Sequence, residues 1–250
     1  MTKALLKAAL RKIGLQPVDR GKEPDLAVST DRAFHELYEL AKTKTRMTGF
    51  DPALRRERHY TLKHLLSNAL IEEGDVCEVG CWRGLSAYQI AAQIRSSGTP
   101  ATFHIFDSFA GLSEDQPADE LGGSREALTA RRQQLACPLE TVQENLKEFP
   151  FIEYHPGWIP ERFGDVEEGR FCFVHVDVVL HQPIRDSFLF FYPRLTRRGI
   201  MVFDDYGYGR FPGAKKAVDE CRKLCGDPFF LPLPSGQAFL INHSPAESRR

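Results

Sequence analysis

The chain has 250 residues, of which 42% are hydrophobic and 27% charged, and its formal net charge is -1. This composition is typical of a soluble globular protein that is long enough to bury a core without covalent staples. The 33 basic and 34 acidic residues nearly balance, so no overall field favours nucleic acid and we expect no nucleic-acid partner.

The N-terminal residues do not have the features of a targeting segment. Lys3, Lys7, Arg11 and Lys12 interrupt the apolar core that a signal peptide needs. No run approaches the roughly 20 apolar residues that span a bilayer, so we expect no integral membrane segment. The six cysteines form no C-x-x-C pair, which disfavours structural zinc. We therefore expect a cytoplasmic protein with free thiols.

Residues 2–14 have the spacing of a short basic amphipathic helix, and a loop rich in glycine and proline follows. We assign residues 1–50 to an N-terminal helical extension. Its first helix can dock on the domain, on a second subunit or on a membrane surface. A homo-oligomer is therefore one of the possible assembly states.

From residue 51 the pattern alternates between helices and short apolar runs. A helix is expected over 52–73. The expected strands are 76–79, 103–106, 151–154, 171–179 and 200–203, separated by helices over 86–95, 124–147 (interrupted at Pro138) and 183–196. Alternating strands and helices predict parallel strands joined by right-handed crossovers.

The last part of the domain follows a different rule. After a helix over 213–224, two apolar runs at 229–233 and 238–242 lie too close together for a helical crossover, so they should pair antiparallel. The predicted fold is α/β and Rossmann-like. It has a seven-stranded, mostly parallel sheet with an antiparallel last strand and helices on both faces, over residues 51–245.

Open α/β sheets bind ligands at the carboxyl ends of their strands. The first strand ends in Glu78, and Gly80 and Gly84 follow before a helix that starts near Ser86. Glycine lets the backbone approach a ligand closely. The dinucleotide fingerprint is incomplete because Trp82 holds one of its glycine positions, so a ligand without pyrophosphate is favoured.

The second strand ends in Asp107, which Ser108 follows. A carboxylate at this place can accept hydrogen bonds from both hydroxyls of a ribose. The alternative interpretation is a turn cap.

Three acids are expected at neighbouring strand ends. Asp177 ends the fourth strand, and Asp204 and Asp205 end the fifth. Carboxylates crowded together repel one another unless a cation compensates them. A hard divalent cation such as Mg²⁺ takes oxygen ligands, so these residues form a candidate metal site. Solvated loop acids are the alternative.

Residues 73–242 resemble the macrocin O-methyltransferase family of metal-dependent sugar O-methyltransferases. The segments that carry the resemblance are 78–84 (EVGCWRG), 106–112 (FDSFAGL), 157–160 (GWIP), 192–195 (YPRL), 203–207 (FDDYG) and 217–219 (AVD).

The resemblance implies a class I methyltransferase fold, S-adenosylmethionine as cofactor and Mg²⁺ held by Asp177, Asp204 and Asp205. The implied acceptor is a hydroxyl of a sugar or glycosylated small molecule. We assign cofactor binding to the first two strand ends, at Glu78, Gly80, Trp82, Gly84, Ser86, Asp107 and Ser108.

The sequence departs from the family pattern after strand four. Val179 replaces a second acid and His181 replaces a tyrosine. We take Asp177 and His181 as the candidate catalytic residues, since histidine titrates near neutrality, although His181 can equally be a surface residue. Residues 112–137 are long, polar and charged, and we interpret them as a lid over the cofactor cleft.

Three other functions stay open. A catechol-type methyltransferase shares the cofactor and the metal but would carry Asp-Asn where this chain has Asp204-Asp205. A nicotinamide oxidoreductase conflicts with the incomplete glycine fingerprint. A binding module without catalytic activity is supported only by the altered residues Val179 and His181.

Overall fold

The computed structural model describes residues 27–49, 51–113, 129–130, 133–209 and 211–243. The predicted helix over 2–14 lies outside these residues, as does most of the predicted lid over 112–137. Within the described part, no helix combines the length and the apolar character that a membrane crossing requires.

The described residues form a seven-stranded sheet with the strand order β3-β2-β1-β4-β5-β7-β6. The strands are β1 (Asp75–Val79), β2 (Phe103–Asp107), β3 (Ile152–Pro156), β4 (Phe171–Val176), β5 (Leu195–Phe203), β6 (Phe230–Pro232) and β7 (Ala238–Ile241). Strands β1 to β5 pair in parallel, and β7 is antiparallel to both β5 and β6. The predicted mostly parallel sheet with an antiparallel last strand is confirmed.

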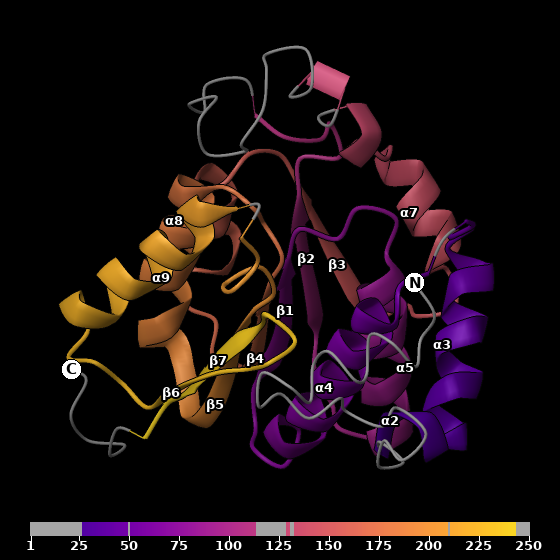
Figure 1. The fold of residues 1–250 in the computed structure, drawn as a ribbon, viewed down its shortest axis with the longest axis horizontal. Coiled ribbons are helices and arrows are strands. Elements are labelled where there is room, and N and C mark those ends of the chain that lie inside the picture. Colours follow the sequence, from indigo (N-terminus) through magenta and orange to yellow (C-terminus); the bar gives the residue numbers. More distant parts are fainter. Residues whose placement is uncertain (1–26, 50, 114–128, 131–132, 210, 244–250) are drawn as a thin grey trace, which may run out of the picture.

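Helices cover both faces of this sheet (Figure 1). The helices on one face are α3 (Arg32–Lys44), α4 (Ala53–Ala69), α5 (Leu85–Ser97) and α7 (Leu139–Asn145), and the short helix α2 (Ala27–Thr30) packs against α4. The other face carries η3 (Glu161–Val166), α8 (His181–Phe191), η4 (Tyr192–Arg194) and α9 (Pro212–Leu224).

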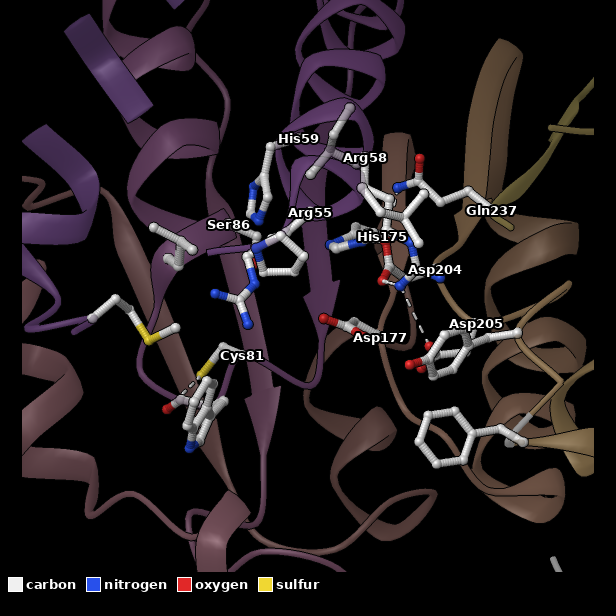
Figure 2. Close-up of a pocket in the computed structure, with 18 residues that line it drawn as sticks. Arg55, Arg58, His59, Cys81, Ser86, His175, Asp177, Asp204, Asp205 and Gln237 are labelled. Atoms are coloured by element: carbon white, nitrogen blue, oxygen red, sulfur yellow. Dashed lines mark hydrogen bonds and ion pairs between the residues drawn. The ribbon is translucent and has the colours of Figure 1, made fainter. Parts of the chain in front are cut away.

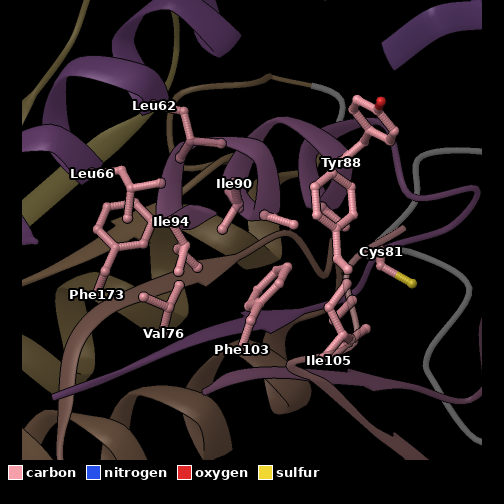
Figure 3. Packing of buried hydrophobic residues seen from close by; sticks show 14 of the residues in the cluster. Leu62, Leu66, Val76, Cys81, Tyr88, Ile90, Ile94, Phe103, Ile105 and Phe173 are labelled. Atoms are coloured by element: carbon pink, nitrogen blue, oxygen red, sulfur yellow. The ribbon is translucent and has the colours of Figure 1, made fainter. Parts of the chain in front are cut away.

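The face under α4 and α5 is a continuous apolar core (Figure 3). Leu62 and Leu66 of α4 and Ile90 and Ile94 of α5 are buried there against the sheet. Most residues of the strands under them are apolar, as expected where a parallel sheet is covered on both faces. This packing fixes α4 over β4 and β5.

Helix α3 belongs to the same core. Its buried residues Phe34, Tyr38 and Ala41 recur at helical spacing and pack with α4 and α5. Asp31 caps the helix by accepting from the Phe34 backbone N–H at 2.9 Å. The described part of the predicted extension is therefore helical and continuous with the domain core, while the domain boundary at residue 50 stays a prediction.

Two strands, β4 and β5, differ from their predicted bounds by three residues or more at one end. β4 ends at Val176, not at residue 179, because its ladders with β1 and β5 stop there. Val178 and Val179 instead line a cavity, which accounts for their apolar character. β5 begins at Leu195, five residues before the predicted Ile200, because Leu195 pairs with Phe171 of β4 before an irregularity in the register.

Candidate functional site

The carboxyl ends of the parallel strands border two cavities in the described structure. The Asp107 cavity, of about 660 Å³, lies beyond β1, β2, β3 and β4. The Asp205 cavity, of about 530 Å³, lies beyond β4 and β5 and under α4. Both volumes are in the range of small-molecule sites. Trp82 and Asp177 line both cavities, so the two spaces meet at these side chains.

The loop from β1 to α5 is shaped by backbone that favours glycine. Gly80 has φ +86°, and a Cβ on it would lie 2.3 Å from the backbone oxygen of Asp177. Gly84 has φ +88° and precedes the first turn of α5. Trp82 adopts φ +47°, which is uncommon for a bulky residue. At Gly80 the loop therefore lies so close to the residue after β4 that only glycine fits.

Asp107 fixes this loop. Its carboxylate accepts hydrogen bonds from the backbone N–H groups of Cys81 at 2.8 Å, Trp82 at 3.1 Å and Phe109 at 2.8 Å. Asp107 therefore caps these turns, as the alternative interpretation predicted. Asp107 also lines the Asp107 cavity. Because a carboxylate has about four acceptor positions, one remains for a ligand hydroxyl.

The predicted cofactor residues are distributed unevenly. Gly80, Trp82, Asp107 and Ser108 line the Asp107 cavity. Ser86 lines the Asp205 cavity instead. Gly84 lines neither, and its role is to begin α5 against Leu146.

The predicted contact of Glu78 with the cofactor needs correction. Its side chain is fully buried and lines neither cavity. One carboxylate oxygen lies 2.8 Å from Nδ1 of His175, its register partner on β4. Burial beneath the loop leaves Glu78 to hold His175, and we do not retain it as a ligand contact.

Asp177, Asp204 and Asp205 come together as the strand order predicts. One carboxylate oxygen from each lies within 4.8 Å of the other two. Figure 2 shows the three side chains around one space, with Arg58 and Gln237 beside Asp204. β4 and β5 are hydrogen-bonded neighbours, which is why residues about 27 positions apart in the chain meet here.

Charged and polar side chains from distant segments surround Asp204. Arg58 of α4 places Nη1 2.8 Å from Asp204 and 3.5 Å from Asp205. Gln237 donates to Asp204 at 2.7 Å. His175 lies 3.7 Å away through Nε2. This set of contacts holds the Asp204 carboxylate in place from three sides.

The pKa values of the cluster diverge. Burial, together with the charges of Asp204 and Asp205, raises the pKa of Asp177 well above its ordinary value. Burial and then Asp204 raise the pKa of Asp205 to about 7. Burial would also raise the pKa of Asp204, but His175 and Arg58 outweigh it and hold that pKa well below ordinary. Asp204 thus carries the negative charge while its two neighbours resist ionisation.

His175 is the cationic partner within the sheet. Burial would lower its pKa, but Asp204 and Glu78 outweigh burial and raise that pKa to about 10. The buried imidazolium therefore offsets part of the negative charge at the strand ends.

His181 does not lie where the sequence suggested. Its Nε2 is 3.0 Å from a carboxylate oxygen of Glu220 on α9, and it lines neither cavity. The reason is that Asp177–Leu180 form a loop, so His181 is the first residue of α8 and faces the neighbouring helix. Its position does not support a catalytic role, and we do not retain one.

Sequence reasoning missed the contribution of α4. Helix α4 precedes the first strand in the sequence, yet its residues Arg55, Arg58 and His59 line the Asp205 cavity. The only signal was the arginine-rich start of this helix, which is equally typical of a solvated face. Gln237, in the turn before β7, was also missed, because a single glutamine in a turn is equally typical of a solvated residue.

Comparisons with known proteins agree with this architecture. The chain matches the family described as Macrocin-O-methyltransferase (TylF) over residues 26–226. It is 31% identical over 160 residues to 8-demethyl-8-(2,3-dimethoxy-alpha-L-rhamnosyl)-tetracenomycin-C 4'-O-methyltransferase of Streptomyces olivaceus, covering 62% of this chain and 57% of that one. It is 28% identical over 192 residues to mycinamicin III 3''-O-methyltransferase of Micromonospora griseorubida, covering 68% and 69%.

A further relative, demethyldecarbamoylnovobiocin O-methyltransferase of Streptomyces niveus, is 27% identical over 154 residues, 60% of this chain and 58% of that one. The match thus spans less than two thirds of the length of two of these three relatives.

Solved structures show the same fold. The O-methyltransferase NovP superposes with a TM-score of 0.65 at 23% identity, over 76% of this chain and 81% of that one. The calicheamicin methyltransferase CalS11 superposes with a TM-score of 0.63 at 16% identity, over 89% and 95%. The fold is therefore that of class I methyltransferases, and the chain belongs to the macrocin O-methyltransferase family.

Proposed function

We propose that this chain is an O-methyltransferase. It transfers a methyl group from S-adenosylmethionine in the Asp107 cavity to a hydroxyl of a sugar or glycosylated small molecule in the Asp205 cavity. The observation that carries the proposal is that the two cavities meet at Trp82 and Asp177. Two adjoining spaces of small-molecule size that share a carboxylate in their walls suit a donor and an acceptor.

The relatives favour a glycosyl acceptor. The Streptomyces olivaceus relative is named for methylation of a rhamnosyl tetracenomycin, and the Micromonospora relative for a 3'' position of mycinamicin. The lining of the Asp205 cavity suits such a polar acceptor, since Arg55, His59 and Gln237 offer hydrogen bonds.

The aspartate cluster fits a Mg²⁺ ion. In octahedral coordination at 2.0–2.1 Å, ligand oxygens lie about 2.9 to 4.1 Å apart. The three carboxylate oxygens already lie within 4.8 Å of one another, so small side-chain shifts suffice. Asp177, Asp204 and Asp205 would hold the ion, and its charge would let all three ionise together. When bound, it would lower the pKa of a substrate hydroxyl, as it does for water.

The protein's own residues chiefly position the reactants, because the sulfonium of the donor supplies the reactivity. Asp107 and the loop that it fixes hold the donor. Arg58 holds the Asp204 carboxylate in place from α4. Asp177, half-buried between the two cavities, is positioned to accept the hydroxyl proton on a carboxylate oxygen.

A mass-spectrometric screen tests this function. The purified chain is incubated with S-adenosylmethionine and Mg²⁺ against a panel of glycans, glycosylated small molecules and catechols. We expect a mass increase of one methyl group on a glycosylated acceptor, and none with Asp205→Asn. Transfer to catechols alone would replace the acceptor class with the catechol type, and undiminished transfer in EDTA would remove the metal from the proposal.

A further inference from the structure

A second group of potential metal ligands lies on the opposite half of the sheet from the aspartates. His104 on β2 and Glu153 and His155 on β3 each offer one ligand atom, and these atoms lie within 4.8 Å of one another. His104 and Glu153 are direct partners in the β2–β3 register, and His155 is two residues further along β3 on the same face. Register therefore builds this group, which we call the histidine cluster.

The two imidazoles face each other. Nδ1 of His104 lies 3.0 Å from Nε2 of His155, and the same Nδ1 lies 3.6 Å from a carboxylate oxygen of Glu153. In a tetrahedral zinc site with bonds of 2.0–2.1 Å, neighbouring ligand atoms lie about 3.3 Å apart. These two separations bracket this value, and the third, between Glu153 and His155, is within 4.8 Å, so an ion can bind after a shift of the exposed Glu153 side chain.

The far nitrogens of both rings lie next to carboxylates. Nδ1 of His155 lies 3.0 Å from Asp165 on η3, and Nε2 of His104 lies 3.7 Å from Asp75 on β1. A metal-binding histidine almost always donates its other N–H to such a group, which fixes the tautomer. With the protons on these far nitrogens, the two facing nitrogens are left unprotonated, and their lone pairs can bind a metal ion.

Aromatic packing holds the rings in this arrangement. The His155 ring stacks on Phe106 with centroids 4.3 Å apart and planes 12° apart. Phe171 meets the His104 ring edge-on at 5.9 Å. Both histidines are buried, whereas Glu153 is exposed at the edge strand β3. The edge thus gives an ion access, and the exposed acid can close over it.

We propose that His104, Glu153 and His155 form a binding site for a transition-metal dication such as Zn²⁺, separate from the aspartate cluster. Two imidazoles and one carboxylate are a ligand set suited to such ions, whereas Mg²⁺ prefers oxygen ligands alone. The ion would join the edge strand β3 to β2. Because His155 precedes Gly157, which lines the Asp107 cavity, it would also anchor the start of that cavity's wall.

Co²⁺ is the probe for this site, since a tetrahedral Co²⁺ complex with nitrogen ligands absorbs visible light. The full chain is titrated with Co²⁺ in millimolar Mg²⁺, which fills the aspartate cluster, and the ion is then displaced with Zn²⁺. We expect a single equivalent with a tetrahedral spectrum in the wild type, and none in His104→Gln or His155→Gln. Asp165→Asn should weaken binding about 10- to 100-fold.

Two controls separate this site from others. His181→Gln removes a histidine that also contacts a carboxylate but lies outside the histidine cluster, and should leave the Co²⁺ spectrum unchanged. Asp205→Asn should leave it unchanged as well. Glu153→Ala changes an exposed residue and should also abolish the tetrahedral spectrum. It therefore tests the site even if a buried histidine variant fails to fold.

The proposal is overturned if the wild type gives no spectrum at millimolar Co²⁺. It is equally overturned if the spectrum survives in His155→Gln and Glu153→Ala, or disappears in Asp205→Asn.

Discussion

The Asp107 cavity and the Asp205 cavity lie side by side but are built in different ways. At the first, the carboxylate of Asp107 is held by backbone N–H groups of the adjacent loops. At the second, Asp204 is held by side chains from α4 and from the turn before β7, 146 and 33 positions away. The donor side thus depends on backbone N–H groups at most 26 positions away, and the acceptor side depends on side chains that come from as far as α4.

The largest effect should come from the acceptor side. Asp204→Asn and Asp205→Asn each remove a charged oxygen ligand, so we expect turnover to fall at least about a hundredfold with cofactor affinity unchanged. Methyl-transfer rates and calorimetry on the same preparations measure both quantities. Glu220→Gln is the matched control, because it makes the same change on α9 outside both cavities. Equal loss in the control would mean that the effect is one of stability.

On the donor side, cofactor affinity is the quantity that should change. Asp107→Ala removes the acceptor for three backbone N–H groups and for the ligand, so we expect S-adenosylmethionine binding to weaken by roughly 1.5 to 3 kcal/mol. Calorimetric titration measures this loss. Unchanged affinity in a folded variant would remove Asp107 from the cofactor site and leave it as a turn cap alone.

A matched pair of glycines tests the close approach of the β1–α5 loop to β4. Gly98→Ala meets no atom within 4 Å, so only its left-handed backbone is strained, at about 1–2 kcal/mol. Gly80→Ala adds a contact of 2.3 Å with the Asp177 backbone, and we expect it to cost at least about 1 kcal/mol more. Denaturant unfolding compares the two, and equal losses would contradict the close approach.

The smallest effect concerns acid stability through His59 in the Asp205 cavity. Burial lowers the pKa of His59 from 6.5 to about 4. The unfolded chain therefore binds a proton between these values while the folded chain does not, and stability falls as pH drops from 6.5 towards 4. His59→Gln should flatten this part of the melting-temperature profile, whereas His64→Gln, at an exposed position of the same helix, should not. Identical profiles for both variants would exclude His59 as the cause.

The fold was predictable because the signals are local and repeated. Apolar runs ending in acids or glycines located the strands, and the short link between the last two runs required antiparallel pairing. The bounds of β4 failed because Val178 and Val179 are apolar for the sake of a cavity, and an apolar run cannot reveal which surface it faces.

The site was predictable only where topology determines position. Asp177, Asp204 and Asp205 were expected together because parallel neighbours end at the same edge, and they do meet. Arg58 was not, since its position depends on how α4 packs over β4 and β5. The predicted roles of Glu78 and His181 were not retained, because a position next to a strand end does not determine where a side chain points.

Diffraction from crystals grown with Mn²⁺ and S-adenosylhomocysteine tests the central claim most directly, because anomalous scattering locates the metal without an identified acceptor. We predict a manganese peak bound by Asp177, Asp204 and Asp205, with the homocysteine sulfur in the Asp107 cavity directed towards it past Trp82. A manganese peak away from these three aspartates would contradict the metal site. S-adenosylhomocysteine bound in the Asp205 cavity would contradict the assignment of donor and acceptor to the two spaces.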